Sequence, residues 1–185
     1  MARVILASKS PRRKELMEML KIPFEIIVSD IEEQIDPDND LTKEIEKLSY
    51  QKAEAVFKKE SDALVIGSDT IVKINNQVLG KPKSQEEARE MLHLLSGNTH
   101  EVIPGVTILY QDQRETFSST SSVTFYPLTD EEIDTYIATN EPLDKAGSYA
   151  IQGDGAKFIQ SIHGDFYTIV GLPIGELYHR LKKYL

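Results

Sequence analysis

Residues 63–72 read Ala-Leu-Val-Ile-Gly-Ser-Asp-Thr-Ile-Val, and they place a carboxylate, Asp69, inside the most apolar run of the chain. The aliphatic residues 63–66 predict a strand that is covered on both faces, as in an open α/β sheet. Gly67 and Ser68 are expected to loosen the chain, so that Asp69 lies at the mouth of this strand. A buried carboxylate is costly unless it is paired, hydrogen-bonded or bound to a metal. Asp69 is therefore either a satisfied structural group or a functional one, because open α/β sheets bind ligands at the carboxyl ends of their strands.

The composition limits the class of protein. A chain of 185 residues, 40% apolar and 28% charged, can bury a real core and predicts a single domain over residues 1–185, with room for two lobes. The net charge of -9 argues against a nucleic-acid partner or an acidic membrane surface, so any anion site must be local. The absence of cysteine excludes disulfides and cysteine nucleophiles and favours a cytoplasmic location. No apolar run approaches the ~18 residues of a membrane span or resembles a secretory leader.

The N-terminal region predicts a strand over residues 4–7 and a helix over residues 11–21, with Ser10 as its N-cap. The first turn of this helix holds three cations, Arg12, Arg13 and Lys14. Helical spacing places Arg13 on the apolar face, so it points inward or along a groove. The helix dipole disfavours cations here, and a phosphate at the helix N-terminus would compensate. The alternative is that the arginines are solvated.

The rest of the chain alternates between strand and helix patterns, which predicts an α/β fold. We expect further strands over residues 24–28, 70–74, 78–79, 101–110, 115–126, 157–162 and 166–170, and helices over residues 41–59, 84–96, 129–140 and after residue 173. Lys52 lies on the apolar stripe of its helix, so it either extends to water or points into a cleft. Lys81 lies between Gly80 and Pro82, which suits a fixed loop. The glycine-rich residues 144–156 permit close approach to a ligand, or form an irregular turn.

These unusual positions share a chemistry. Cations at a helix start and in constrained positions can hold a polyphosphate, while carboxylates such as Asp69 and Glu33 can hold a divalent metal or take a proton from water. The chain contains no G-x-x-x-x-G-K-[ST] loop, no G-x-G-x-x-G fingerprint and no G-x-S-x-G elbow. The residues therefore predict a nucleotide- or phosphate-handling α/β enzyme.

A set of short motifs runs through the whole chain in order. They are Ser8-Lys-Ser-Pro-Arg-Arg13, Gly67-Ser-Asp-Thr70, Gly80-Lys-Pro82, Ser96-Gly97 with His100, Asp144-Lys-Ala-Gly-Ser-Tyr-Ala-Ile-Gln-Gly153, Gly164-Asp165 and Val170-Gly-Leu-Pro173. Together they closely resemble the Maf family of nucleoside triphosphate pyrophosphatases. One departure is Pro104, where the family more often has threonine.

This resemblance implies a Maf/Ham1-like fold, as in inosine triphosphate pyrophosphatase: an elongated mixed sheet flanked by helices, in two lobes with a nucleotide cleft between them. It implies a homodimer that hydrolyses a nucleoside triphosphate between the α and β phosphates with a divalent cation, Mg²⁺ or Mn²⁺. The products are the monophosphate and pyrophosphate, and the role is to keep modified nucleotides out of nucleic acids. The family's association with septum formation leaves an alternative, a non-catalytic nucleotide-binding regulator of cell division.

The resemblance also implies roles for individual residues. Asp69 resembles the general base, with Glu33 as its partner on the metal side, and both would be metal ligands. The residues that resemble the triphosphate-binding set are Ser8, Arg13, Lys52 and Lys81. The residues that match the type acting on dTTP and UTP, and not the type acting on methylated GTP, are Arg12, Thr70 and Gln152. The amide of Gln152 offers one donor and one acceptor to the O4 and N3–H edge of uracil or thymine.

Overall fold

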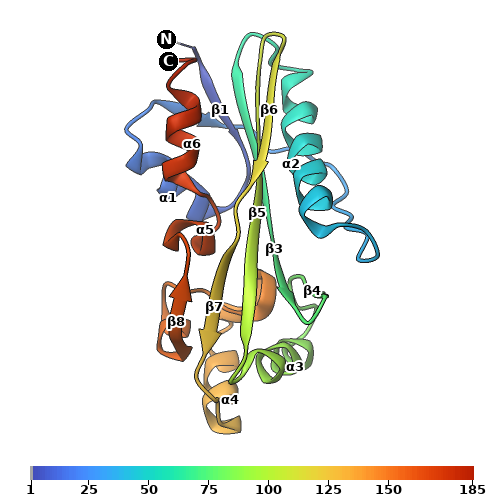
Figure 1. The fold of residues 1–185 in the computed structure, drawn as a ribbon, viewed down its shortest axis with the longest axis vertical. Coiled ribbons are helices and arrows are strands. Elements are labelled where there is room, and N and C mark those ends of the chain that lie inside the picture. Colours follow the sequence, from blue (N-terminus) through green and yellow to red (C-terminus); the bar gives the residue numbers. More distant parts are fainter. Residues whose placement is uncertain (1) are drawn as a thin grey trace. The chain divides into compact units, whose positions relative to one another are not determined.

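The computed structural model describes residues 2–185, which form a mixed α/β fold. Within this range eight strands make one sheet, in the order β2-β1-β3-β5-β7-β8, with β4 paired to β3 and β6 paired to β5 (Figure 1). The chain divides into two compact units: the first contains residues up to 70, 104–119 and 171–185, and the second contains residues 71–103 and 120–170. This division into units does not test the prediction of a single domain over residues 1–185, which stays a prediction.

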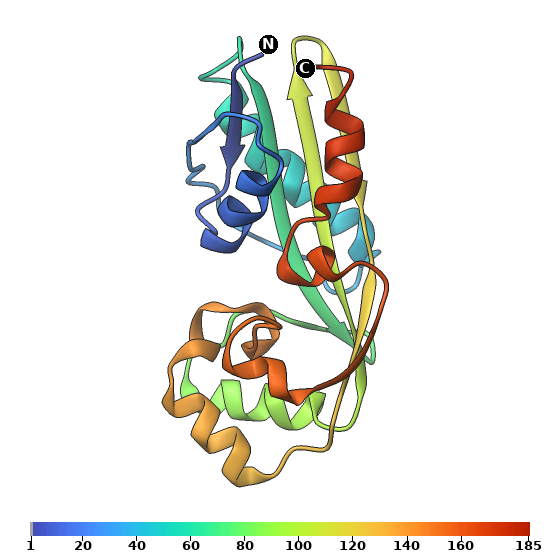
Figure 2. The ribbon, with the colours of Figure 1, turned by 90° about the vertical axis from the view of Figure 1, so that its left-hand side faces the viewer.

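The first unit is built on a parallel core. Strand β1 (Val4–Ala7) pairs in parallel with β2 (Phe24–Ile26) and with the start of β3 (Leu64–Ile74). Helices α1 (Pro11–Met19) and α6 (Ile174–Leu181) lie on one face of these strands, and α2 (Leu41–Phe57) lies on the other face (Figures 1 and 2). Covered on both faces, residues 63–66 are fully buried, as the sequence predicts.

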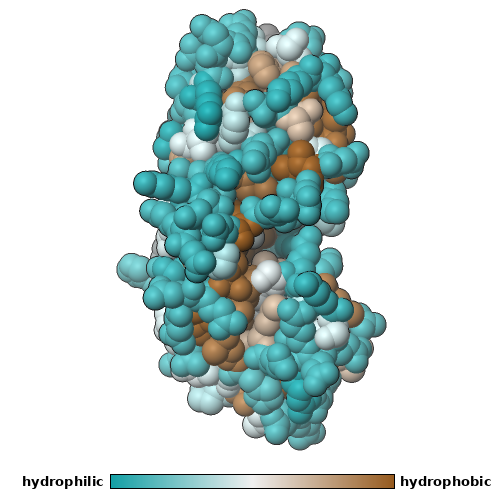
Figure 3. Space-filling view, turned by 90° about the vertical axis from the view of Figure 1, so that its right-hand side faces the viewer, coloured by the Kyte–Doolittle hydropathy of each residue, from teal (hydrophilic) through white to brown (hydrophobic). Residues whose placement is uncertain are grey.

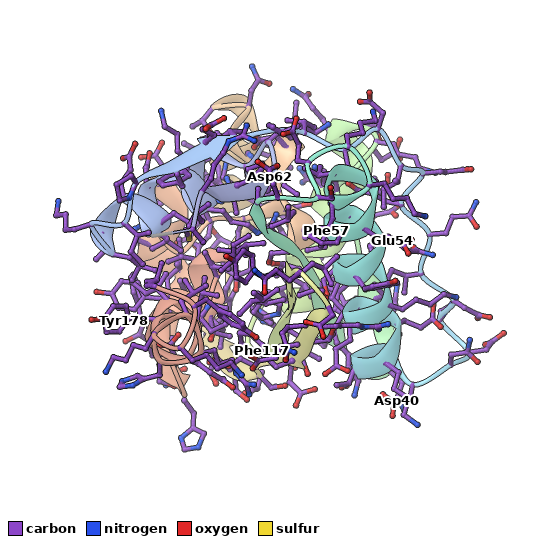
Figure 4. The ribbon with its side chains drawn as sticks, turned by 90° about the horizontal axis from the view of Figure 1, so that it is seen from above. Asp40, Glu54, Phe57, Asp62, Phe117 and Tyr178 are labelled. Atoms are coloured by element: carbon purple, nitrogen blue, oxygen red, sulfur yellow. The ribbon has the colours of Figure 1, made fainter. Side chains whose placement is uncertain are left out.

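Helix α2 is well defined at its N-terminus. The side chain of its N-cap, Asp40, accepts a hydrogen bond from the backbone N–H of Thr42 at 2.9 Å. This bond satisfies a donor that the helix itself leaves free. Figure 4 shows Asp40 and Phe57 at opposite ends of the helix. The predicted helix over residues 41–59 is confirmed with a slightly earlier end.

The second unit combines short helices with antiparallel strands. Strand β5 (Thr99–Tyr110) begins in this unit and pairs with β7 (Ser121–Phe125), which in turn pairs with β8 (Ile159–His163). The other elements are β4 (Gln77–Leu79), α3 (Gln85–Leu95), α4 (Asp130–Ala138), α5 (Phe166–Val170) and three 3₁₀ turns, η1 (Glu141–Asp144), η2 (Ala146–Ser148) and η3 (Asp154–Phe158). Their side chains enclose one apolar cluster.

An aromatic group lies within that cluster. His100 is buried, and its Nε2 lies 2.6 Å from the hydroxyl of Tyr149. Both rings meet Phe125 edge-on. Burial lowers the pKa of His100 to about 4, so its ring is neutral at pH 7. This histidine is therefore a structural group.

The prediction that the chain loosens at Gly67 and Ser68 is wrong. Strand β3 continues without a break to Ile74, so Asp69 lies inside a strand and not at its end. The physical reason is the packing of α2: a Cβ atom at position 67 would lie 2.4 Å from the carbonyl oxygen of Ser49. Glycine is therefore needed for close approach of a helix. What ends here is the parallel pairing, because Gly67 is the last residue of β3 that is paired with β1.

Two other predicted strands differ from the structure. Residues 166–170 form helix α5, whose first turn is capped by the Asp165 carboxylate, which accepts a hydrogen bond from the backbone N–H of Thr168 at 2.7 Å. The predicted strand over residues 115–126 is divided into β6 (Gln113–Ser118) and β7. Both pair antiparallel with β5, at different parts of its length.

No helix within residues 2–185 is long and apolar enough to cross a membrane. Hydrophilic side chains dominate the face drawn in Figure 3, with smaller apolar areas between them.

The contact between Gly67 and α2 gives a stability prediction. Gly67→Ala should lower the free energy of unfolding by about 1–3 kcal/mol, because the new methyl group has no space and the helix must move. The measurement is urea denaturation followed by circular dichroism. Gly175→Ala in α6 is the matched control: its Cβ atom meets nothing within 4 Å, so it should stabilise the protein slightly. Equal stability of Gly67→Ala and the wild type would contradict the predicted clash.

Candidate functional site

Lys52 is the centre of a charged cluster in the first unit. Its Nζ lies 2.6 Å from Oδ2 of Asp69 on β3 and 2.6 Å from Oε1 of Glu33, in the segment between β2 and α2. The side chains of Lys52 and Asp69 are only 10% and 16% exposed, whereas that of Glu33 is 45% exposed. Of the two interpretations of Lys52, extension to water is therefore wrong. It points inward and carries the positive charge between two carboxylates.

Arg13 is a second cation in the same cluster. Its Nε donates a hydrogen bond to the carbonyl oxygen of Gly171 at 2.9 Å, Nη1 donates to Oγ of Ser8 at 3.1 Å, and Nη2 donates to Oγ1 of Thr70 at 2.8 Å. Nη2 also lies 3.8 Å from Oδ1 of Asp69. The guanidinium is buried, so the solvated alternative is wrong for this arginine. Its planar fork ties three separate segments to one another.

The local sequence explains why Arg13 points inward. Helix α1 begins at Pro11 after the N-cap Ser10, whose side chain accepts a hydrogen bond from the backbone N–H of Arg13 at 3.4 Å. Starting from this position, helical spacing puts Arg13 on the same side as the buried Leu16 and Met17. The helix start is thus fixed by a cap, and the cap fixes the direction of the guanidinium.

Asp69 is held in its ionised form. Burial alone would raise its pKa, but the nearby charges of Arg13 and Lys52 and the hydrogen bond from the Thr70 backbone N–H together lower the pKa below the ordinary value. The Thr70 N–H donates to Oδ1 at 2.8 Å. Asp69 is therefore negatively charged at neutral pH, which suits a carboxylate that binds a cation or orients water.

Glu33 and Asp69 have the right chemistry for a hard divalent cation. Mg²⁺ is commonly bound by one or two carboxylates, with substrate phosphates and water completing its coordination. Within residues 2–185 no group of three or more acidic or histidine side chains could hold a metal. Oδ2 of Asp69 is buried and has the ion pair with Lys52 but no hydrogen bond of ordinary geometry. Glu33 and Asp69 are the carboxylates of this cluster that could hold a cation, and both contact Lys52.

The structure brings together most of the residues predicted from the sequence. The residues of the first unit that meet around Arg13 and Lys52 are Ser8, Arg13, Glu33, Lys52, Asp69 and Thr70. Arg12 is half-buried in the first turn of α1. Lys81 and Gln152 are exposed residues of the second unit, and their predicted roles stay predictions.

The sequence did not single out Gly171 as part of the cluster. Its carbonyl oxygen accepts the hydrogen bond from Nε of Arg13 and lies 3.4 Å from Oγ1 of Thr70. Its φ of 133° favours glycine and turns this carbonyl. The motif Val170-Gly-Leu-Pro173 contains Gly171 and was the only available signal. No side chain marks the position, because the contact is made by the backbone.

Comparisons with known proteins identify the family and the fold of the chain. Residues 3–184 match the family described as Maf-like protein. Two relatives from Bacillus cereus, strains B4264 and AH187, are both named dTTP/UTP pyrophosphatase; they are 53% and 54% identical over 184 residues, which cover 100% of this chain and 96% of each relative. The structure of the Staphylococcus aureus Ham1 protein is similar with a TM-score of 0.55 at 14% identity, covering 99% of this chain and 100% of that chain. This likeness concerns the fold alone and confirms the predicted Maf/Ham1-like fold.

The ion pairs of Lys52 give a prediction about Asp69. In Lys52→Met the pKa of Asp69 should rise, because one of the two cations that stabilise its charged form is gone. The stabilisation by ionised Asp69 is complete above its unfolded-state pKa and is lost as the pH falls to its folded-state pKa, so Lys52→Met should lose a smaller contribution, over a narrower pH range that ends at a higher pH. Titration of the Asp69 carboxyl carbon by NMR measures the change directly.

The matched control for this titration is Lys58→Met. Lys58 is an exposed lysine at the end of the same helix and pairs with Glu54 on the surface. Its removal should leave the titration of Asp69 unchanged. An unchanged midpoint in Lys52→Met as well would show that Lys52 does not set the charge of Asp69.

Proposed function

Since the chain belongs to the Maf-like protein family, we propose that it is a nucleoside triphosphate pyrophosphatase acting on dTTP and UTP and on modified pyrimidine triphosphates. It hydrolyses the bond between the α and β phosphates and releases the monophosphate and pyrophosphate. The observation that carries this proposal is the 53% identity, over the full chain, to a relative named dTTP/UTP pyrophosphatase. The charged cluster around Lys52 supports it, because its cations suit phosphates and its carboxylates suit hydrolysis.

The cluster divides into binding and reacting groups. Arg13 and Lys52 provide positive charge for the triphosphate, and Ser8 lies beside the N-terminus of α1, where a phosphate is favoured. Arg13 uses only part of its fork within the protein, so donors remain for phosphate oxygens. Because these cations are fixed before the substrate arrives, they stabilise developing charge on the phosphates without reorganisation.

Asp69 is the proposed acceptor of the proton from the attacking water. Its low pKa keeps it ionised, and the hydrogen bond from the Thr70 N–H leaves one oxygen, Oδ2, facing Lys52. Glu33 and Asp69 are the residues that would hold Mg²⁺ or Mn²⁺. This cation would neutralise phosphate charge and help to orient the scissile bond.

Selection of the pyrimidine nucleobase is assigned to other residues. Gln152 reads the O4 and N3–H edge of the pyrimidine through its amide, and Thr70 and Arg12 contribute to the same preference. Lys81 adds positive charge for the triphosphate. Supporting this assignment is the match of these residues to the type that acts on dTTP and UTP. The homodimer and the cytoplasmic location stay predictions.

The first test is identification of the products. Incubation with dTTP or UTP and Mg²⁺ or Mn²⁺ should release pyrophosphate and the monophosphate, measured by anion-exchange chromatography. Addition of EDTA should stop the reaction if a divalent cation is required. Release of orthophosphate and the diphosphate would contradict cleavage between the α and β phosphates. Binding without any turnover would favour the alternative, a nucleotide-binding regulator of septum formation.

A second test concerns Asp69. Asp69→Asn should lower kcat at least about 100-fold, the usual contribution of a positioned proton acceptor, while dTTP still binds. Isothermal calorimetry and steady-state kinetics measure the two effects separately. The control is Asp62→Asn, an exposed carboxylate before β3 that should leave kcat unchanged (Figure 4). Full activity of Asp69→Asn would remove Asp69 from the role of base.

A further inference from the structure

Glu141 is a carboxylate of the second unit that has no part in the proposed hydrolysis, and its side chain binds backbone N–H groups. The side chain of Glu141, at the start of η1, accepts hydrogen bonds from the backbone N–H groups of Asp154 and Gly155, each at 3.3 Å. One oxygen takes each donor, so both ends of the carboxylate are engaged. These donors lie directly after the segment Ile151–Gly153, which contains Gln152.

The other end of this segment is held by Tyr136 on α4. The backbone N–H of Ala150 donates to the hydroxyl of Tyr136 at 3.3 Å. Burial and the negative charge of the nearby Glu141 carboxylate raise the pKa of this phenol. The tyrosine ring is fully buried and packs edge-on against Phe158. Tyr136 and Glu141 therefore form one connected polar unit, and both ends of the segment are attached to it.

The glycines of the segment fit closely against this unit. A Cβ atom at Gly153, whose φ is 90°, would lie 2.2 Å from Oε1 of Glu141. A Cβ atom at Gly155 would lie 2.6 Å from the carbonyl oxygen of Ala150 and 2.9 Å from the Tyr136 hydroxyl. The backbone thus approaches the two side chains so closely that only glycine fits. This arrangement accounts for Gly153 and Gly155, two of the three glycines in residues 144–156.

Glu141 is itself held in place. Its backbone N–H donates to Oγ1 of Thr139 at 3.1 Å, and its carbonyl oxygen accepts from Nζ of Lys145 at 3.0 Å. The carboxylate is therefore mounted on a fixed turn between α4 and η2. A rigid support of this kind reduces the number of directions that the exposed Gln152 side chain can take.

We propose that Glu141 and Tyr136 are positioning residues for base selection, which fix the segment Ile151–Gly153 and thereby the direction of the Gln152 amide. This inference rests on the proposed role of Gln152 in reading the pyrimidine edge. Uracil and thymine present an acceptor and a donor there, whereas cytosine presents the reverse arrangement. An amide that can turn over pairs with either base, so discrimination depends on holding it in one orientation.

The test compares two substrates in two variants. In Glu141→Gln one oxygen becomes an amide nitrogen, which faces a backbone donor, and in Tyr136→Phe the link to Ala150 is removed. Both variants should lower the ratio of kcat/KM for dTTP over dCTP by about 10-fold, the effect of losing one hydrogen bond, through KM for dTTP and with kcat nearly unchanged. The control is Glu131→Gln, an exposed carboxylate in the first turn of α4, which should leave the ratio unchanged.

A structural readout accompanies the kinetics. Amide hydrogen exchange of Asp154 and Gly155 should become faster in Glu141→Gln, while far-ultraviolet circular dichroism stays as in the wild type. Faster exchange with an unchanged dTTP to dCTP ratio would make Glu141 merely structural and overturn the proposal. A uniform loss of kcat for both substrates would overturn it as well.

A further variant separates this inference from the proposed function. Gln152→Ala should lower the same ratio; if it does not, base reading by Gln152 fails and the positioning role fails with it, while pyrophosphate release by the wild type would stand. If the wild type released no pyrophosphate, the proposed function would fail. The ratio of the dissociation constants for dTTP and dCTP would then test the positioning role by itself, in the same variants.

Discussion

The direct contact between helix α2 and strand β3 is the constraint on which the candidate site depends. Gly67 lets the backbone of α2 approach the strand without an intervening side chain. Lys52 and Asp69 therefore start from backbones that are close together, and their ion pair of 2.6 Å needs no unusual reach. A larger residue at position 67 would separate the two charges. The geometry of the charged cluster is in this sense determined by a residue that has no side chain.

The charged side chains of the cluster in the first unit can be buried because they are paired with one another. Two cations and two carboxylates would each be costly to bury alone. Arg13 is neutralised in part by Asp69 and is hydrogen-bonded at all three of its nitrogens, while Lys52 contacts both carboxylates. The cluster is nearly balanced in charge, so it can persist without a ligand. An incoming triphosphate and its cation would meet groups that are already oriented.

Local sequence signals predicted those features that depend on neighbouring residues. The cap at Ser10 and the spacing to Leu16 were sufficient to place Arg13 inside. The continuity of β3 was missed because the helix that explains Gly67 is distant in sequence. The helix over residues 166–170 was missed for another reason. A short apolar run has no clear period, and the hydrogen bond to the Asp165 carboxylate stabilises the helical turn. The contact of Glu33 with Lys52 was not predicted, because the family resemblance gave Glu33 only as a partner of Asp69 and an acidic loop gives no indication of its partner.

Gly67 and Gly105 also restrict which substitutions this protein can accept. Both glycines present bare backbone to α2, at Ser49 and Ile45 respectively, so the helix contacts two different strands at points where no side chain intervenes. At these two points the helix cannot adjust to a larger residue in the sheet without moving its own backbone. Sequence variation that preserves the fold is thereby directed to the outward face of α2. Substitutions should therefore be tolerated best on that outward face and least at Gly67 and Gly105.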